Sequence, residues 1–302
     1  MNRIILEKLP LARREKPSPS NRFGGFDVIC FIILLVFALL IIFPFYYLFV
    51  VSITPQEIYA SNPSLLWTPR VTFDAYNTVF HEPQIWGGLK ITLILLFGGT
   101  LYQMFFTVIT GYALSRNKWV GKNFVMNMIL VTMFFGGGLI PYYFLIKSLG
   151  MMNSIWVMII PGAIDTFNML LMRNYFASLP KELEESAKID GANDIQVFLK
   201  IFLPLSLPML ATIGLFFAVG NWNSWYNGML FNRDQELKTL QQVLQDVVYT
   251  PKSSIPNPNQ GKITTESIKM AAIFFTIIPM MLFYPFLQRY FVKGIVVGAI
   301  KG

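Results

Sequence analysis

The sequence is poor in the residues that build metal sites, disulfides and nucleophilic active sites. Its 302 residues include one cysteine, Cys30, and one histidine, His81. Zinc sites draw mainly on Cys and His ligands, a disulfide needs two cysteines, and most serine nucleophiles need a histidine base. We therefore expect no metal site, no disulfide framework and no catalytic residues within this chain.

Charge is also scarce. Asp, Glu, Lys and Arg make up 13% of the residues, against about 25% in an average soluble domain. Hydrophobic residues make up 54% and include 28 Phe and 15 Met. Because such a surface suits hydrocarbon better than water, the sequence predicts an integral membrane protein. The net charge of +8 then reflects the basic bias that orients membrane segments, and we expect no nucleic-acid partner.

Six apolar stretches are long enough to cross a membrane. A hydrocarbon core about 30 Å thick needs about 20 mainly apolar residues per helix. The stretches cover residues 28–51, 86–114, 124–148, 155–172, 204–226 and 268–291. The expected fold class is therefore all-α, with six transmembrane helices and both termini on the same side.

Basic residues are distributed unevenly between the two sides. Sixteen of the 24 Lys and Arg fall within residues 1–27, 116–122, 173–200 and 289–302. The positive-inside rule places both termini in the cytoplasm. The first apolar run exceeds 20 residues and lacks a small-residue cleavage site, which indicates an uncleaved helix. We expect a cytoplasmic tail over residues 1–27, one membrane domain over 28–291 and a second cytoplasmic tail over 292–302.

The cytoplasmic segment over residues 179–204 carries helix start signals. Pro180 suits a first helical position. Three carboxylates follow within two turns, where they favour the positive end of the helix dipole: Glu182, Glu184 and Glu185. The segment therefore predicts a helix that begins near residue 180.

A turn and a second short helix are expected to follow. Gly191 permits a left-handed turn, and either Asn193 or Asp194 suits the N-cap of the next helix. Apolar residues at helical spacing then share one face: Ile195, Phe198, Leu199 and Phe202. The result is a bent helix pair at the inner membrane surface, either an amphipathic hairpin without a partner or a docking element.

The same segment contains a spaced pattern. Glu185-Ser186-Ala187 is followed by three residues and Gly191, and after nine more residues by Ile-x-Leu-Pro. This pattern resembles the signature loop of permease subunits of binding-protein-dependent ABC importers, with Ser186 where the family prefers Ala. The resemblance implies that the loop is a coupling helix inserted in a groove of a cytoplasmic ATPase subunit. The coupling residues it implies are Glu185, Ser186, Ala187, Asp190, Gly191, Ala192, Ile201, Leu203 and Pro204.

Four further motifs, over residues 135–142, 168–174, 222–226 and 284–302, are similar to the carbohydrate branch of this family. That branch includes maltose-type permeases and permeases for oligosaccharides derived from complex polysaccharides. The resemblance implies type I ABC importer architecture in the cytoplasmic membrane of a prokaryote. The partners it implies are a second homologous permease in a heterodimer, two cytoplasmic ATPase subunits that hold ATP and Mg, and an extracytoplasmic sugar-binding protein.

The sequence holds no Gly-x4-Gly-Lys-Ser/Thr phosphate loop, so we expect this chain to bind no ATP or other cofactor itself. A closing ATPase dimer would instead drag a rigid docked helix pair together with the membrane helices that flank it. The expected function is half of an alternating-access path for a carbohydrate, in a chain that is not an enzyme. A permease of the same class for a non-sugar solute, or a secondary transporter, is the alternative.

Asp165 lies about ten residues into the fourth apolar stretch, near the middle of the bilayer, where an ionisable group suggests function. Pro161-Gly162 should break that helix, so Asp165 or Thr166 can also serve as the cap of its second half. Both roles stay open. Asp165 and nearby Asn168 are candidates for the substrate path.

A run of asparagines and aromatic residues begins at Asn221, about 17 residues beyond Pro204 and therefore near the outer interface. Trp and Tyr at this depth are typical of an aromatic belt. Helical spacing also places Asn223 and Asn227 on one face, beside flat rings that suit sugar hydroxyls and pyranose faces. The candidate sugar contacts are Trp222, Asn223, Trp225, Tyr226 and Asn227.

Two further features concern the outer side and the third stretch. Apolar residues at helical spacing over 237–248 predict an amphipathic helix on the outer surface, followed by a Pro/Asn/Ser-rich loop over 250–261. That loop is either a solvated connection or a contact for the binding protein. Gly136 to Gly138 are expected to allow close helix packing or a kink.

Overall fold

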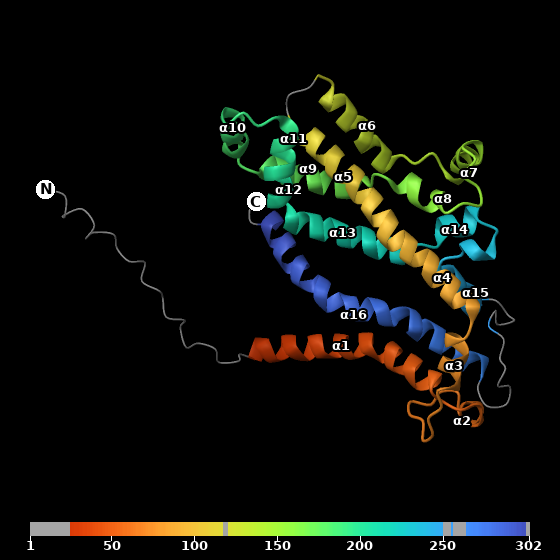
Figure 1. The fold of residues 1–302 in the computed structure, drawn as a ribbon. Helices are drawn as coiled ribbons and strands as arrows, with labels where there is room; N and C mark the ends of the chain where they lie inside the picture. The colour runs from red at the N-terminus through yellow and green to blue at the C-terminus, as the bar shows by residue number, and fades with distance from the viewer. Residues whose placement is uncertain (1–24, 117–119, 250–254, 256–263, 300–302) are drawn as a thin grey trace. The chain divides into compact units, whose positions relative to one another are not determined.

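The computed structural model describes residues 25–116, 120–249, 255 and 264–299, with side chains as far as residue 282. All regular structure in this part of the chain is helical (Figure 1). The chain divides into two units, residues 1–47 and 48–302, which we describe separately. The predicted N-terminal tail lies almost entirely outside the described residues.

The first unit contributes most of α1 (Gly25–Ser52), a helix of 28 residues. Its sequence is almost continuously apolar, and most of its large hydrophobic side chains are exposed. A helix of this length exceeds the roughly 20 residues that a membrane crossing requires. It therefore agrees with the first predicted span.

In the second unit, α4 (Pro83–Ile94), the π-helical turn η1 (Leu95–Gly99) and α5 (Thr100–Ser115) follow one another without interruption and agree with the second predicted span. Helix α5 packs against α9 (Thr166–Ser178) and α13 (Leu207–Trp222). Helix α16 (Thr265–Ala299) contains the last predicted span and also packs against α13. Residues 292–299 were predicted to belong to the C-terminal tail, but they continue α16.

The third predicted span is divided at its glycines. The helix axis changes direction by 117° between α6 (Lys122–Phe134) and α7 (Leu139–Ser148). Gly138 precedes α7 with φ 84° and ψ 165°, a backbone conformation that is essentially restricted to glycine. The expected kink is thus a complete break, and Gly138 is the residue that permits it.

The fourth predicted span is also interrupted. It consists of α8 (Trp156–Ile159), the short 3-10 helix η2 (Ile160–Gly162) and α9. The break predicted at Pro161-Gly162 is confirmed, since proline supplies no N–H to continue the helix. By length and composition the described residues contain three helices able to cross a membrane, or up to five if each bent pair counts as one span. The expected count of six is not reproduced, because this segment offers no continuous crossing helix.

The predicted amphipathic helix is confirmed as α15 (Leu240–Tyr249), with Leu240, Val243 and Val247 buried. It packs against α4 and α16. The loop predicted over residues 250–261 lies outside the described residues except for residue 255. The remaining short elements on this part of the chain are α2 (Gln56–Ser61), α3 (Asp74–Phe80), α14 (Tyr226–Phe231) and η4 (Gln235–Leu237).

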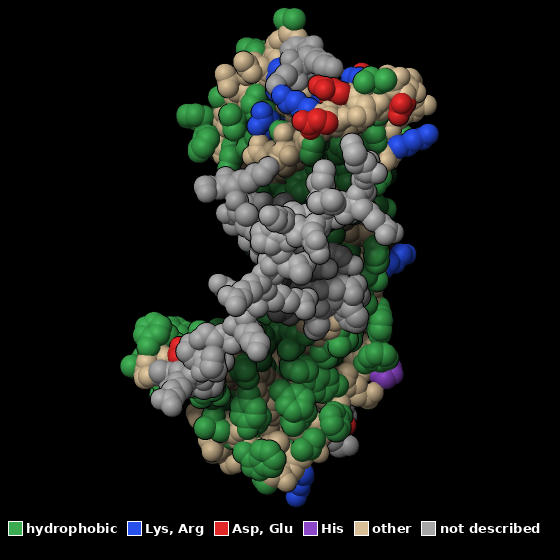
Figure 2. Space-filling view, turned by 90° about the vertical axis from the view of Figure 1, so that its left-hand side faces the viewer, with side chains coloured by type: hydrophobic (Ala, Val, Ile, Leu, Met, Phe, Trp, Pro, Cys, Tyr) green, Lys and Arg blue, Asp and Glu red, His purple; other side chains and the backbone are tan. Residues whose placement is uncertain are grey.

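Hydrophobic side chains form three clusters in the second unit, and one of them matters most for function. It joins α5, α9 and α13 to the segment after α9, through buried residues such as Phe176, Val197 and Phe202. That segment carries α10 (Lys181–Ile189) and α11 (Asp194–Val197). In Figure 2 the charged side chains gather at the end of the molecule that carries these two helices, and much of the other coloured surface is hydrophobic.

Candidate functional site

The segment over residues 179–204 folds as a hairpin, and we use that name for it below. It contains α10, a turn, α11, the π-helical turn η3 (Phe198–Phe202) and α12 (Leu203–Leu205). Pro180 is the N-cap of α10 rather than its first residue, a difference of one position. Glu182 and Glu184 lie in the first turn, as the dipole argument predicts.

The turn of the hairpin is held by backbone hydrogen bonds. Gly191 has φ 82°; its N–H donates to Lys188 O at 3.1 Å, and the N–H of Ala192 donates to Ala187 O at 2.9 Å. These two bonds form a Schellman motif, which needs a left-handed residue at the glycine position. The left-handed turn predicted at Gly191 is confirmed. Among the described residues the side chain of Asp190 makes no hydrogen bond to the turn.

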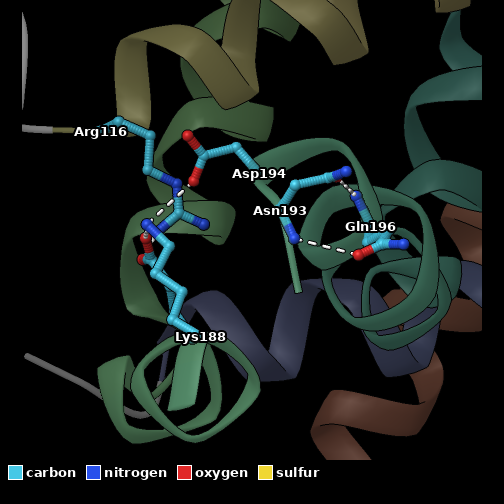
Figure 3. Close-up of polar contacts among 6 residues, drawn as sticks. Arg116, Lys188, Asn193, Asp194 and Gln196 are labelled. Atoms are coloured by element: carbon cyan, nitrogen blue, oxygen red, sulfur yellow. Dashed lines mark hydrogen bonds and ion pairs between the residues drawn. The ribbon is translucent and has the colours of Figure 1, made fainter. Parts of the chain in front are cut away.

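The second helix of the hairpin begins with a capping box. Asn193 Oδ1 accepts from Gln196 N at 2.8 Å, and Gln196 Oε1 accepts from Asn193 N at 3.0 Å (Figure 3). Asn193 is therefore the cap, and Asp194 is not. The carboxylate of Asp194 instead pairs with Lys188 Nζ at 2.9 Å, across the turn. This ion pair ties the start of α11 to the end of α10.

An ion pair joins the hairpin to the second membrane helix. Arg116, the residue after α5, pairs with Glu184 of α10, whose carboxylate also accepts from Lys188 Nζ at 2.8 Å. The side chains of Arg116 and Glu184 are 21% and 13% exposed, so water screens this pair less than it screens a surface pair. The end of α5 and the hairpin are thereby held together.

Aromatic rings support the same arginine. The guanidinium of Arg116 lies 4.6 Å from the ring centre of Tyr112 and 4.0 Å from that of Phe202. The Tyr112 ring in turn lies 4.6 Å from Phe198 and 5.6 Å from Phe176. A cation over two aromatic faces and beside a carboxylate is fixed in direction as well as in charge. Sequence reasoning does not find Arg116 as a site residue, because Glu184 is 68 positions away along the chain.

The signature residues of the hairpin divide into two groups. Ala187, Ala192, Ile201 and Leu203 pack on the cluster formed by α5, α9 and α13. Glu185, Ser186, Asp190, Gly191 and Pro204 are exposed. One group therefore fixes the hairpin to the membrane helices, and the other is available to a partner.

The expectation of a single apolar face on the second helix is wrong. Phe202 is buried and Phe198 packs on the same cluster, whereas Ile195 is 69% exposed and Leu199 is 52% exposed. Ile189, at the end of α10, is 86% exposed. The hairpin thus has an inner aromatic side and exposed aliphatic residues on its outer side, and exposed aliphatic residues at a charged surface are typical of a contact area.

A cavity of about 390 Å³ lies between the membrane helices. We call it the polar cavity; it is formed by α5, α8, α9, α13 and α14 and by the chain between α8 and α9. It is lined by Gln103, Met158, Gly162, Ile164, Asp165, Asn168, Phe216, Phe217, Gly220, Asn221, Ser224 and Asn227. Its size falls within the range of roughly 300–1,000 Å³ typical of small-ligand pockets. Within the described residues no three His, Cys, Asp or Glu side chains gather as a metal site would require.

Asp165 is the N-cap of α9, and its Oδ1 accepts from Asn168 N at 2.8 Å. The capping role left open by the sequence is confirmed. Asp165 also lines the polar cavity together with Asn168. Asn168 is 7% exposed, and its side-chain Oδ1 has no hydrogen-bond partner among the described residues. Buried acceptors are normally paired, so Asn168 Oδ1 is an exception among the described residues.

A polar network crosses from α13 to α5 beside the cavity. Asn221 Nδ2 donates to Gln103 Oε1 at 2.9 Å and to Thr100 Oγ1 at 3.0 Å. Two glycines make room for these amides. A Cβ at Gly99 would lie 3.1 Å from Asn221 Nδ2, and a Cβ at Gly162 would lie 3.0 Å from Gln103 Nε2. Gln103 and Asn221 are absent from the residues predicted for the substrate path, although the run that begins at Asn221 marks the region.

The other predicted path residues lie elsewhere. Helix α13 ends at Trp222 and α14 begins at Tyr226, so the prediction that Asn223 and Asn227 share one helical face is wrong. Trp222 is 4% exposed and belongs to a hydrophobic cluster with α4 and α15. Asn223 is exposed and Trp225 and Tyr226 pack edge to face. Of the seven predicted residues, the cavity brings together Asp165, Asn168 and Asn227.

Comparisons with known proteins agree on one class. A family model described as "Binding-protein-dependent transport system inner membrane component" matches residues 103–297. The chain is 37% identical over 287 residues to the polygalacturonan/rhamnogalacturonan transport system permease protein YtcP of Bacillus subtilis (strain 168), covering 92% of this chain and 98% of that protein. It is 38% identical over 271 residues to Protein LplC of the same organism, covering 86% and 90%.

Solved structures give the same result. One matching chain comes from the crystal structure of a bacterial ABC transporter involved in the import of the acidic polysaccharide alginate. The TM-score is 0.84 at 31% sequence identity, and the match covers 91% of this chain and 100% of that chain. A more distant relative is the arabinooligosaccharides transport system permease protein AraQ of Halalkalibacterium halodurans, 27% identical over 88% of this chain and 93% of that protein.

Proposed function

This chain belongs to the family of binding-protein-dependent transport system inner membrane components, and from that premise we propose that it is a permease subunit of an ABC importer for an oligosaccharide. Membership makes it a multi-pass membrane protein. Its similarity to the permeases named for polygalacturonan/rhamnogalacturonan and for arabinooligosaccharides supports a carbohydrate as the cargo.

The proposed assembly lies in the cytoplasmic membrane of a prokaryote. This chain pairs with a second homologous permease, and the pair receives sugar from an extracytoplasmic binding protein. Two cytoplasmic ATPase subunits bind ATP and Mg and supply the energy, so this chain performs no catalysis. In this arrangement it crosses the membrane six times with both termini in the cytoplasm. The interrupted segment of α8, η2 and α9 then counts as one crossing in addition to the five that the bent helix pairs allow.

The hairpin is the observation that carries the proposal. Arg116 and the aromatic residues beneath it fix the hairpin to α5, while the inner signature residues pack on α9 and α13. Its outer side presents exposed aliphatic residues and carboxylates. A movement imposed on that outer side would be passed to three membrane helices as one body. We assign ATPase coupling to the hairpin on this basis.

The polar cavity is the proposed place for sugar in this subunit. Its amides, hydroxyl and carboxylate offer hydrogen bonds to sugar hydroxyls, and its phenylalanines offer apolar contact. Three of its polar residues were predicted from the sequence: Asp165, Asn168 and Asn227. The structure adds Gln103, Asn221 and Ser224. Trp222, Asn223, Trp225 and Tyr226 are not among its lining residues.

Photocrosslinking tests the coupling assignment. In a Cys30→Ser background, Glu185→Cys labelled with a benzophenone maleimide should capture the ATPase subunit in the assembled complex. Glu57→Cys, on an exposed side chain between the first two predicted spans, is the matched control and should not capture it. ATPase capture from Glu57, or from neither position in a complex that contains the ATPase, would overturn the assignment.

Uptake tests the rest of the proposal. Liposomes that contain both permeases and the ATPases should import an oligosaccharide when the binding protein is outside and ATP is inside. Import without ATP would indicate a secondary transporter. Failure to import any member of a panel of oligosaccharides, with ATPase stimulation by a non-sugar solute, would indicate another cargo.

A further inference from the structure

The polar cavity contains a single charged group among its lining residues that the structure describes. That group is the carboxylate of Asp165, and the other polar side chains are the amides of Gln103, Asn168, Asn221 and Asn227 and the hydroxyl of Ser224. None of the twelve lining residues carries a positive charge. A ligand in this cavity therefore meets one negative charge and no compensating cation.

Asp165 is the charged acceptor among the lining residues, and the side-chain amides of Gln103, Asn168 and Asn227 bring both donors and acceptors. Asn168 is 7% exposed and its Oδ1 has no partner among the described residues. Asp165 uses Oδ1 to cap α9, and a carboxylate retains further acceptor capacity on its second oxygen. Asn221 Nδ2, a donor that could serve an acidic ligand, is already bonded to Gln103 and Thr100. Sugar hydroxyl groups match this set, because they can donate to the carboxylate and accept from the amides.

A uronate unit is a poor match for the same set. Its carboxylate brings acceptors only, and near Asp165 it would meet a group of the same charge, which repels it. A neutral sugar unit carries a hydroxymethyl group at the same position and can donate to Asp165 or Asn168. The two units differ in charge and in donor capacity, and both differences favour the neutral one.

We propose that the polar cavity of this subunit accepts neutral, hydroxyl-rich sugar units and discriminates against uronate units, with Asp165 as the discriminating group. The inference rests on the proposed oligosaccharide function and narrows its substrate class. The proposal separates this cavity from the acidic sugars for which similar proteins are named. YtcP is named for polygalacturonan/rhamnogalacturonan, and the matching solved structure concerns the acidic polysaccharide alginate. On this proposal, a carboxylated unit must find its favourable contacts outside this cavity.

The test compares two sugars of equal length, α-1,4-galactotriose and α-1,4-trigalacturonate, which differ in the group at C6. Ligand-observed NMR on the purified four-subunit complex, without the binding protein, gives a Kd for each. The wild-type complex should bind the neutral sugar about tenfold more tightly than the uronate. Asp165→Asn, which keeps an acceptor for the cap, should bring this ratio close to one by weakening the neutral sugar and strengthening the uronate.

Two controls separate the outcomes. Glu57→Gln removes a carboxylate from an exposed side chain outside the cavity and should leave the ratio unchanged, and equal melting temperatures show that Asp165→Asn assembles normally. Equal or tighter uronate binding in the wild type, or a ratio that Asp165→Asn does not change, would overturn the proposal while leaving the oligosaccharide function intact. Absence of binding and uptake for both sugars and for a wider oligosaccharide panel would reject the proposed function itself.

Discussion

The hairpin and the polar cavity use polar side chains in opposite ways. In the hairpin, charged groups are paired with one another: Arg116 with Glu184, and Lys188 with both Glu184 and Asp194. In the cavity, the carboxylate of Asp165 has no cation among the lining residues, and the buried Asn168 Oδ1 has no partner among the described residues. Closed pairs make a segment rigid, whereas unpaired groups leave a place for a ligand.

Both regions include a π-helical turn, which makes the contrast sharper. Leu95–Gly99 brings Gly99 against Asn221 beside the cavity, and Phe198–Phe202 brings Phe202 under Arg116 in the hairpin. Such turns interrupt regular helix packing and are frequent at functional sites. If the hairpin couples to the ATPase and the cavity binds sugar, substitutions in the hairpin should alter ATP hydrolysis. Substitutions in the cavity should alter only sugar binding and uptake.

The largest effect is expected at Gly191. Gly191→Val places a β-branched residue at φ 82°, which costs about 1–3 kcal/mol of backbone strain and should distort the turn. We expect stimulated ATPase activity and uptake to fall at least about tenfold, since 1.4 kcal/mol corresponds to a factor of ten. Gly191→Asn is the matched control, because Asn tolerates this conformation and a Cβ there meets nothing within 4 Å. Equal losses in both variants would show that backbone conformation is not the cause.

The next effect concerns the attachment of the hairpin to α5. Arg116→Gln leaves Glu184 without its partner from α5 and should destabilise the hairpin by about 1–3 kcal/mol, as for a hydrogen bond to a charged group. Hydrogen exchange of the α10 amides should then accelerate by roughly tenfold or more. Arg70→Gln breaks the pair with Glu57, whose side chains are 74% and 78% exposed, and should leave exchange unchanged. Identical exchange in the two variants would contradict the role given to Arg116.

A smaller effect is expected where glycine makes room for the cavity amides. A Cβ at Gly99 would lie 3.1 Å from Asn221 Nδ2, whereas a Cβ at the neighbouring Gly98 meets nothing within 4 Å. Gly99→Ala should displace the Asn221 amide and lower oligosaccharide uptake severalfold, with basal ATPase activity retained. Gly98→Ala should transport at the wild-type level. Reduced basal ATPase activity in Gly99→Ala would mean that the cavity and the hairpin are not separable.

The smallest effect is on stability at Asp165. Asp165→Ala removes the acceptor for Asn168 N, which should cost about 1 kcal/mol and lower the melting temperature of the complex by a few degrees. Asp165→Asn retains an acceptor and should melt like the wild type. If the two variants melt alike, capping by Asp165 contributes nothing to stability.

Local features of the fold could be predicted from the sequence. Gly191 marks its own turn, because few other residues adopt a left-handed conformation readily. Pro161 marks the break before α9, and Asp165 follows at the position of a cap. Each of these conclusions depends on one residue and its immediate neighbours, so no knowledge of packing is needed.

Features that depend on distant neighbours could not be predicted. Arg116 becomes a site residue because Glu184 and Phe202 meet it in space. Trp222 lies in a hydrophobic cluster with α4 and α15 rather than in the cavity, although the preceding residue, Asn221, lines the cavity. Asn227 reaches the cavity from α14, a separate helix, and not by sharing a face with Asn223. In each case packing between helices decides where the side chain points.

The number of sugar molecules imported per ATP hydrolysed, measured for Arg116→Gln in liposomes, tests the central claim most directly. The claim is that the hairpin passes the movement of the ATPase to the membrane helices as one rigid body through its attachment to α5. At unchanged subunit stoichiometry, this ratio should fall in Arg116→Gln and remain at the wild-type value in Arg70→Gln. A wild-type ratio in an assembled, hydrolysing Arg116→Gln complex would contradict the claim.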